Sequence, residues 1–129
     1  MMTGSDGSND IASALIDGAL TALRANKGWA DQAVAQLPDD KLHVALEPET
    51  NCIAVVMKHL AGNLLSRWTE FLTSDGEKPW RDRDDEFVDT FASRTELLAH
   101  WESGWGRMFE ALESLTAADV GKTVFIRGE

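Results

Sequence analysis

Hydrophobic residues recur with a helical period in three stretches of this chain. The longest apolar-rich stretch, residues 51–72, has no proline and a single glycine, so it contains no strong helix breaker. Its apolar residues follow one another at three- and four-residue spacing, which predicts one broad face of a helix over 51–73. We expect that face to point into the core, and it consists of Ile53, Met57, Leu60, Leu64, Trp68 and Phe71.

A second, mixed face of the same predicted helix contains the residue best suited to chemistry, His59. On that side lie His59, Val55, Val56, Gly62, Asn63 and Ser66. A helix with apolar residues on nearly all sides is typical of the middle of a bundle. We therefore expect this helix to be central, with a further element of structure over the His59 side.

Two more helices are predicted on either side of this one. Residues 10–37 form an alanine-rich amphipathic pattern, and residues 94–115 carry a clean apolar stripe from Leu97 to Leu115. Ser93 and Glu96 match a capping box at the start of the last helix. The predicted fold class is all-α, with three long helices and no substantial sheet.

The segment between the second and third helices is long for a helix–helix connection. It covers residues 73–92 and contains the charged sequence WRDRDDEF, residues 80–87. One interpretation is a salt-bridged lid in which an arginine such as Arg83 faces a substrate. The other is a solvated charge cluster tied down by aromatic residues. The final KTVFIRGE, residues 122–129, is predicted to be extended.

Length and charge limit the classes of partner. A chain of 129 residues is long enough for one domain, expected over 10–129, after a disordered tail at residues 1–9. The net charge of −10 disfavours nucleic acid and anionic membrane as partners, because both require clustered Lys and Arg. No apolar run is long enough to span a membrane. The single cysteine, Cys52, excludes an internal disulfide, so we expect a cytoplasmic protein.

Three segments resemble the DinB/YfiT-like superfamily. They are KHLAGNLLSRW (residues 58–68), GEKPWRDRDDEF (76–87) and TVFIRGE (123–129), and the resemblance covers residues 10–129. Members of this superfamily are bacterial four-helix bundles, many of them regarded as metal-dependent enzymes. The resemblance implies an up-down bundle in which TVFIRGE leads into a fourth helix. That helix is absent from this chain, so we expect the domain to be C-terminally incomplete.

The same resemblance implies a site and an activity. Its members hold nickel or zinc with three histidines, and His59 stands at the position of the first. The other two belong to an HxxxH pair on the fourth helix and have no counterpart here. Asn63, one turn after His59, is implied to support a metal ligand or to contact the substrate. The implied function is a metal-dependent transferase or hydrolase, and several relatives act on thiol-linked groups.

A second hypothesis belongs to a different class. Without a fourth helix, the His59 side of the second helix would expose Val55 and Val56, and an apolar patch of that kind suggests an interface. The chain would then be a non-catalytic helical module that forms a homodimer through the face normally covered by helix 4. Catalytic residues and the substrate stay open under both hypotheses.

Overall fold

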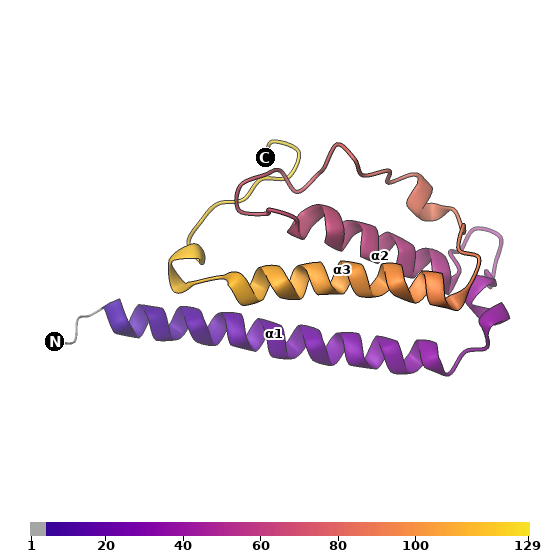
Figure 1. Cartoon of the computed structure of the whole chain (residues 1–129), viewed down its shortest axis with the longest axis horizontal. Coiled ribbons are helices and arrows are strands. Elements are labelled where there is room, and N and C mark those ends of the chain that lie inside the picture. Colours follow the sequence, from indigo (N-terminus) through magenta and orange to yellow (C-terminus); the bar gives the residue numbers. More distant parts are fainter. Residues whose placement is uncertain (1–4) are drawn as a thin grey trace.

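The computed structural model describes residues 5–129, and in this range it is all-helical, with no strand. α1 lies beside α3, α2 packs on α3, and the connection between α2 and α3 runs along the outer side of α2 (Figure 1). The all-α prediction is confirmed. The elements in order are α1 (Ser5–Ala35), η1 (Asp39–His43), α2 (Ile53–Trp68), η2 (Asp85–Phe87), α3 (Arg94–Ser114) and η3 (Ala117–Asp119), where η denotes a short 3-10 helix.

The helix limits differ from the sequence expectations at several ends. α1 begins at Ser5, inside the segment expected to be a tail, while residues 1–4 lie outside the described part of the chain. α2 ends at Trp68, five residues earlier than predicted. The chain leaves the helix because Glu70 adopts a left-handed conformation (φ 47°), and the Ser74 hydroxyl donates to the freed carbonyl of Glu70 at 2.9 Å.

α3 begins almost as predicted. The Ser93 hydroxyl accepts a hydrogen bond from the Glu96 N–H at 3.1 Å, which is one half of the expected capping box. The Glu96 carboxylate turns back and accepts from the Ala92 N–H at 3.0 Å, one residue before the cap. Both contacts satisfy backbone donors near the helix start.

α2 and α3 make the closest helix–helix contact in the described part of the molecule, and small residues permit it. A Cβ placed on Gly104 of α3 would lie 2.8 Å from the Cα of Ala61 on α2, so only glycine fits there. Ala61 is fully buried, whereas Ile53 and Leu60 are 40% and 42% exposed. The predicted core stripe of α2 was therefore wrong in part, because close approach selects the small face and turns two large residues outward.

The His59 side of α2 is covered, but by the connection rather than by a helix. The Ser66 hydroxyl donates to the carbonyl of Gly76 at 2.6 Å and accepts from the Lys78 N–H at 3.2 Å. Val55 on this side is 5% exposed, whereas Val56 remains 41% exposed. The expected exposure is thus wrong for Val55 and right for Val56, and residues 73–92 fold back over part of the His59 side.

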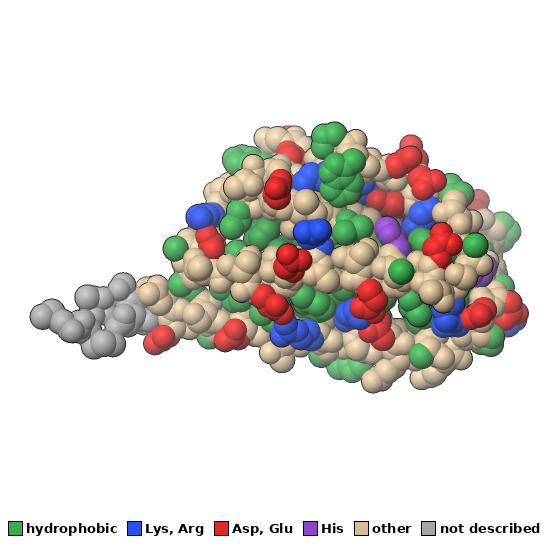
Figure 2. Space-filling model, in the orientation of Figure 1, with side chains coloured by type: hydrophobic (Ala, Val, Ile, Leu, Met, Phe, Trp, Pro, Cys, Tyr) green, Lys and Arg blue, Asp and Glu red, His purple; other side chains and the backbone are tan. Residues whose placement is uncertain are grey.

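The core consists of two apolar clusters that run along the three helices. One joins Val34 of α1 to residues of α2 and α3 such as Met57 and Trp101, and the other joins Leu20 of α1 to Met108 and Leu112 of α3. Figure 2 shows charged side chains spread over the surface seen in that view, with apolar groups between them. Within the described range, none of the helices has the length and hydropathy needed to span a membrane.

Candidate functional site: a histidine held by a buried Arg–Glu pair

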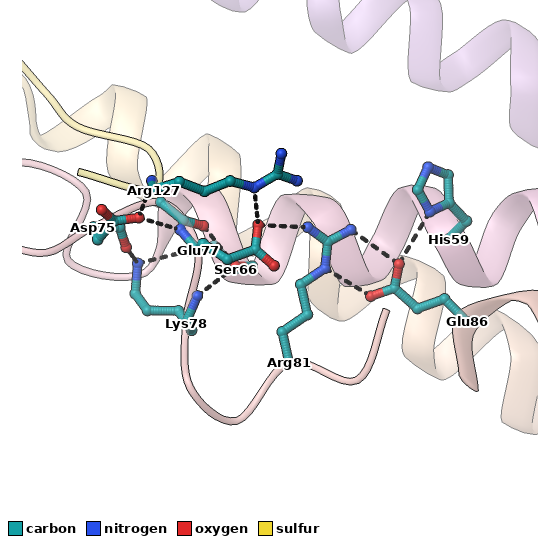
Figure 3. Close-up of polar contacts among 9 residues, drawn as sticks. His59, Ser66, Asp75, Glu77, Lys78, Arg81, Glu86 and Arg127 are labelled. Carbon is teal, nitrogen blue, oxygen red and sulfur yellow. Dashed lines mark hydrogen bonds and ion pairs between the residues drawn. The ribbon is translucent and has the colours of Figure 1, made fainter. Parts of the chain in front are cut away.

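His59 is oriented by a carboxylate from the connection. Its Nδ1 lies 3.0 Å from Oε1 of Glu86, which belongs to η2 (Figure 3). Because an ionised carboxylate can only accept hydrogen bonds, this contact places the proton on Nδ1. Nε2 is then the nitrogen with a free lone pair, and it has no hydrogen-bond partner among the described residues.

Glu86 is itself fixed by a bidentate ion pair. Arg81 donates from Nε to Oε2 at 2.9 Å and from Nη2 to Oε1 at 3.0 Å, and the side chains are 3% and 8% exposed. The hydrogen bonds that Arg81 donates to Glu86 raise the pKa of Arg81 above its ordinary value, against the opposing effect of burial. Such fork-to-fork pairs are among the strongest and most directional polar contacts in proteins. Both carboxylate oxygens of Glu86 therefore accept a hydrogen bond from Arg81, in addition to the contact with His59.

Two packing contacts also hold His59 and Glu86 in place. The imidazole of His59 stacks on the ring of Phe87 with centroids 4.8 Å apart and planes 29° apart. Glu86 lies directly over Gly62 of α2, where a Cβ would come within 2.5 Å of its carboxyl carbon. The side chain of His59 keeps 30% of its surface exposed. The imidazole is thus held in place at its Nδ1 edge and on one face, and it is open to solvent.

A chain of charged side chains connects this site to residues 127–128. Glu77 lies 3.5 Å from Nη1 of Arg81 and 3.7 Å from Nε of Arg127. The carboxylate of Asp75 accepts the backbone N–H groups of Glu77, Arg127 and Gly128, and these bonds lower its pKa. Residues 127–128 are therefore held against the start of the connection and linked to His59 through charged side chains (Figure 3).

Lys58, the neighbour of His59, holds the other end of the connection. Its ammonium donates to the carbonyls of Asp85 and Val88, to the Asp85 carboxylate and to the Thr90 hydroxyl, at 2.8–3.0 Å. Lys58 is 7% exposed, and a buried ammonium is tolerated only when its donors find partners. The adjacent residues Lys58 and His59 thus fix η2 on both sides of Glu86.

The three site residues expected from the sequence lie in different surroundings in the structure. His59 is central, Asn63 is half-buried one turn later and makes no side-chain hydrogen bond among the described residues, and Arg83 is exposed. Among the described contacts the arginine that acts on the site is Arg81, together with Glu86, and the sequence reasoning did not single out either. A signal for them existed: their five-residue spacing in a turn-forming segment, and a glycine within α2 that leaves room for a side chain.

The residues present do not form a complete metal site within one chain. Among residues 5–129, no three His, Cys, Asp or Glu side chains converge so that they could hold an ion. Glu86 is occupied by Arg81, which leaves Nε2 of His59 as a single donor, whereas catalytic zinc sites use three protein ligands. No reaction step through a metal is derived from these residues.

A second histidine–carboxylate pair lies elsewhere, at the start of α2. Nδ1 of His43 is 2.6 Å from Oδ2 of Asp89, and the buried thiol of Cys52 lies 3.8 Å from the same oxygen. No arginine of the described chain pairs with this carboxylate, in contrast to Glu86. The pair links η1 to the connection and gives His43 a structural role.

Comparison with known proteins identifies the family of the chain. Neither the curated proteins nor the solved structures contain a significant match. One family model matches over residues 10–129, which is nearly the whole chain and includes all the residues of the site. The chain therefore belongs to the family described as "Protein of unknown function (DUF1572)".

Proposed function

We propose that this chain is part of a metal-dependent transferase or hydrolase of the DinB/YfiT-like type, in which His59 is a metal ligand through Nε2. The observation that carries the proposal is the contact of His59 Nδ1 with Glu86. Metal-binding histidines usually donate their second N–H to a carboxylate or carbonyl, which fixes the tautomer and the ring orientation. Arg81 and Gly62 support this arrangement by holding Glu86 in one position.

The proposal assigns this chain one ligand of the site and names no other. Nickel and zinc both suit imidazole nitrogen. Thiol-linked substrates follow from the resemblance of residues 58–68, 76–87 and 123–129 to that superfamily. The protein would act in the cytoplasm, which agrees with its single, buried cysteine.

Metal titration of the whole chain tests this assignment. With ¹⁵N-labelled histidine, increasing Zn²⁺ should shift Nε2 of His59 at lower concentrations than the nitrogens of His43 and His100. Binding should be weak, because a single donor is available. His59→Ala should abolish the strongest site, while His43→Ala should leave it unchanged. Zn²⁺ binding that is indifferent to His59→Ala would refute the assignment.

A second candidate function is a helical interaction module that forms a homodimer through α2. It is favoured by the exposed strip of Ile53, Val56 and Leu60, whose exposed fractions are 40%, 41% and 42%. The interface first expected included Val55, but that residue is buried in the core, so the available strip is rotated toward Leu60. Sedimentation of the chain with and without Val56→Asp tests it. Identical sedimentation of both as monomers at high micromolar concentration would exclude this module.

A further inference from the structure

α1 carries a second apolar face that no part of the described chain covers. Its large members are well exposed, at 73% for Ile11, 61% for Leu15 and 67% for Trp29. The face that α1 turns to the core contains different residues, such as Leu20 and Val34. We call the exposed face the α1 seam, and all six of its members are exposed: Ile11, Leu15, Gly18, Ala22, Ala25 and Trp29.

The spacing of the seam is that of a helix that packs along its length against another helix. Successive members are four, three, four, three and four residues apart. The five spacings average 3.6 residues, so the stripe follows the period of a straight α-helix, and their alternation of four and three is typical of helices that pack lengthwise. The seam therefore stays on one side of α1 from Ile11 to Trp29, over roughly 27 Å at 1.5 Å per residue.

The spacing of the seam is also symmetric along the chain, which fits a second copy of α1 as its partner. Read in the reverse direction, the order of the spacings is unchanged. In an antiparallel pair of α1 helices, Gly18 meets Ala22, Leu15 meets Ala25, and Ile11 meets Trp29. A two-fold interface requires such reciprocal contacts, in which residue i meets j and j meets i. The two small residues nearest the axis allow the backbones to approach, and the large residues lie toward the ends.

We propose that α1 pairs with α1 of a second copy of this chain, antiparallel and with the two-fold axis between Gly18 and Ala22. α1 forms one outer edge of the molecule, and its first turns extend past the end of α3, so a second copy can reach it (Figure 1). This surface is separate from the α2 strip and does not depend on the proposed metal ligand. A contact of two helices falls near the lower end of stable interfaces, which bury about 1,200–2,000 Å².

Two consequences follow for the strength of the dimer. A small interface predicts a dissociation constant in the micromolar range, on the order of 1–100 μM. Each copy carries a net charge of −10, and like charges oppose association at low ionic strength. Dimerisation should therefore strengthen when salt is raised, because screening acts on repulsion between the copies.

Disulfide trapping in the full chain tests the direction and register of the pair. A mixture of Leu15→Cys and Ala25→Cys chains should give mainly the mixed disulfide under mild oxidation. Two copies of residue 15 would lie about 15 Å apart along the antiparallel helices, at 1.5 Å per residue. A disulfide needs Cα atoms about 4.4–6.8 Å apart, so homodimers of either variant should be rare. Preferred homodimers would instead show a parallel pair and overturn the antiparallel arrangement.

A neighbouring position supplies the matched control for the face. Arg24 is exposed, lies one residue from Ala25, and points about 100° away from it at the helical period. Leu15→Cys should therefore cross-link to Ala25→Cys at least about tenfold faster than to Arg24→Cys. The native thiol of Cys52 is buried and should contribute little. Equal, slow rates for the two mixtures would contradict the proposal.

Sedimentation tests the same interface without cross-linking. The parent chain should form dimers at micromolar concentrations in high salt, and Leu15→Asp should shift it to monomer, because a carboxylate would be buried in the seam. Val56→Asp on α2 should leave this dimer unchanged, which separates the α1 seam from the α2 strip. A parent chain that is already monomeric at high micromolar concentration in high salt would show that a second copy does not cover the seam.

Discussion

Glu86 rests on Gly62: the backbone of α2 at that glycine leaves the space that the carboxylate fills, and a Cβ there would lie 2.5 Å from the Glu86 carboxyl carbon. One missing side chain on α2 thus permits the contact that orients His59 one turn earlier. The glycine is a cost to the helix of about 1 kcal/mol relative to alanine. Glycine at position 62 is explained by the space that it leaves for the Glu86 side chain.

Gly62→Ala should therefore destabilise the protein, although alanine is the better helix former. We expect a net loss of about 1–3 kcal/mol in the free energy of unfolding, because Glu86 must move and overpacking strains the contact. Gly106→Ala is the control: its added Cβ meets nothing within 4 Å, so it should stabilise by about 0.5–1 kcal/mol. Urea denaturation of both variants measures this. A stabilising Gly62→Ala would show that Glu86 is free to leave α2.

Lys58→Met tests whether the connection is held by its buried ammonium. Methionine keeps most of the apolar stem but removes the charged donor to the Val88 carbonyl and the Thr90 hydroxyl, while the Asp85 carbonyl still accepts the Val88 N–H. We expect a loss of about 1.5–3 kcal/mol, since hydrogen bonds to charged groups contribute about that much. Hydrogen exchange should accelerate in residues 85–91 while α3 stays protected. Unchanged exchange in that segment would contradict this role.

Two tryptophans offer a matched comparison of buried indole groups. Nε1 of Trp101 donates to Asp31 at 2.9 Å, whereas Nε1 of Trp105 is buried without a hydrogen-bond partner among the described residues. Trp101 is 3% exposed and Trp105 is half-buried, so replacement by phenylalanine removes more buried area at Trp101. Trp101→Phe should cost at least about 1 kcal/mol more than Trp105→Phe, because it also loses a hydrogen bond. Thermal or urea unfolding of the two variants gives the difference directly.

His100 should make stability depend on pH near neutrality. Burial beside Phe91 lowers its pKa below the ordinary value of 6.5. As pH falls through about 6.5, the unfolded chain takes up a proton that the folded chain takes up only at lower pH, so the folded state loses stability. His100→Gln should reduce the slope of unfolding free energy between about pH 7 and 5. An unchanged slope would assign the pH dependence to other groups.

The sequence predicts the elements better than their faces. Three helices and the Ser93 cap follow from periodicity and capping residues, and the structure bears them out. The inward face of α2 was misassigned because hydrophobicity ranks Ile53 and Leu60 above Ala61. The contact with Gly104 requires a small residue on α2, and this requirement becomes visible only when the two helices are packed together.

The site could be predicted only in part for a similar reason. His59 was found as a histidine on a helix with apolar residues on most sides, but its partners lie 22 and 27 residues away in a segment without regular structure. Among the arginines of WRDRDDEF, the turn at η2 and the buried Lys58 decide that Arg81 points inward while Arg83 stays exposed. The spacing of residues in the sequence does not show which of the two arginines points inward.

The tautomer of His59 is the most direct test of its proposed role as a ligand. Long-range ¹H–¹⁵N spectra of the histidine rings, recorded near pH 8 where an ordinary imidazole is neutral, distinguish protonation at Nδ1 from protonation at Nε2. The structure predicts that His59 carries its proton on Nδ1, facing Glu86, with Nε2 unprotonated and ready to bind a metal. A His59 ring protonated on Nε2 would contradict the orientation on which the proposed ligand role depends.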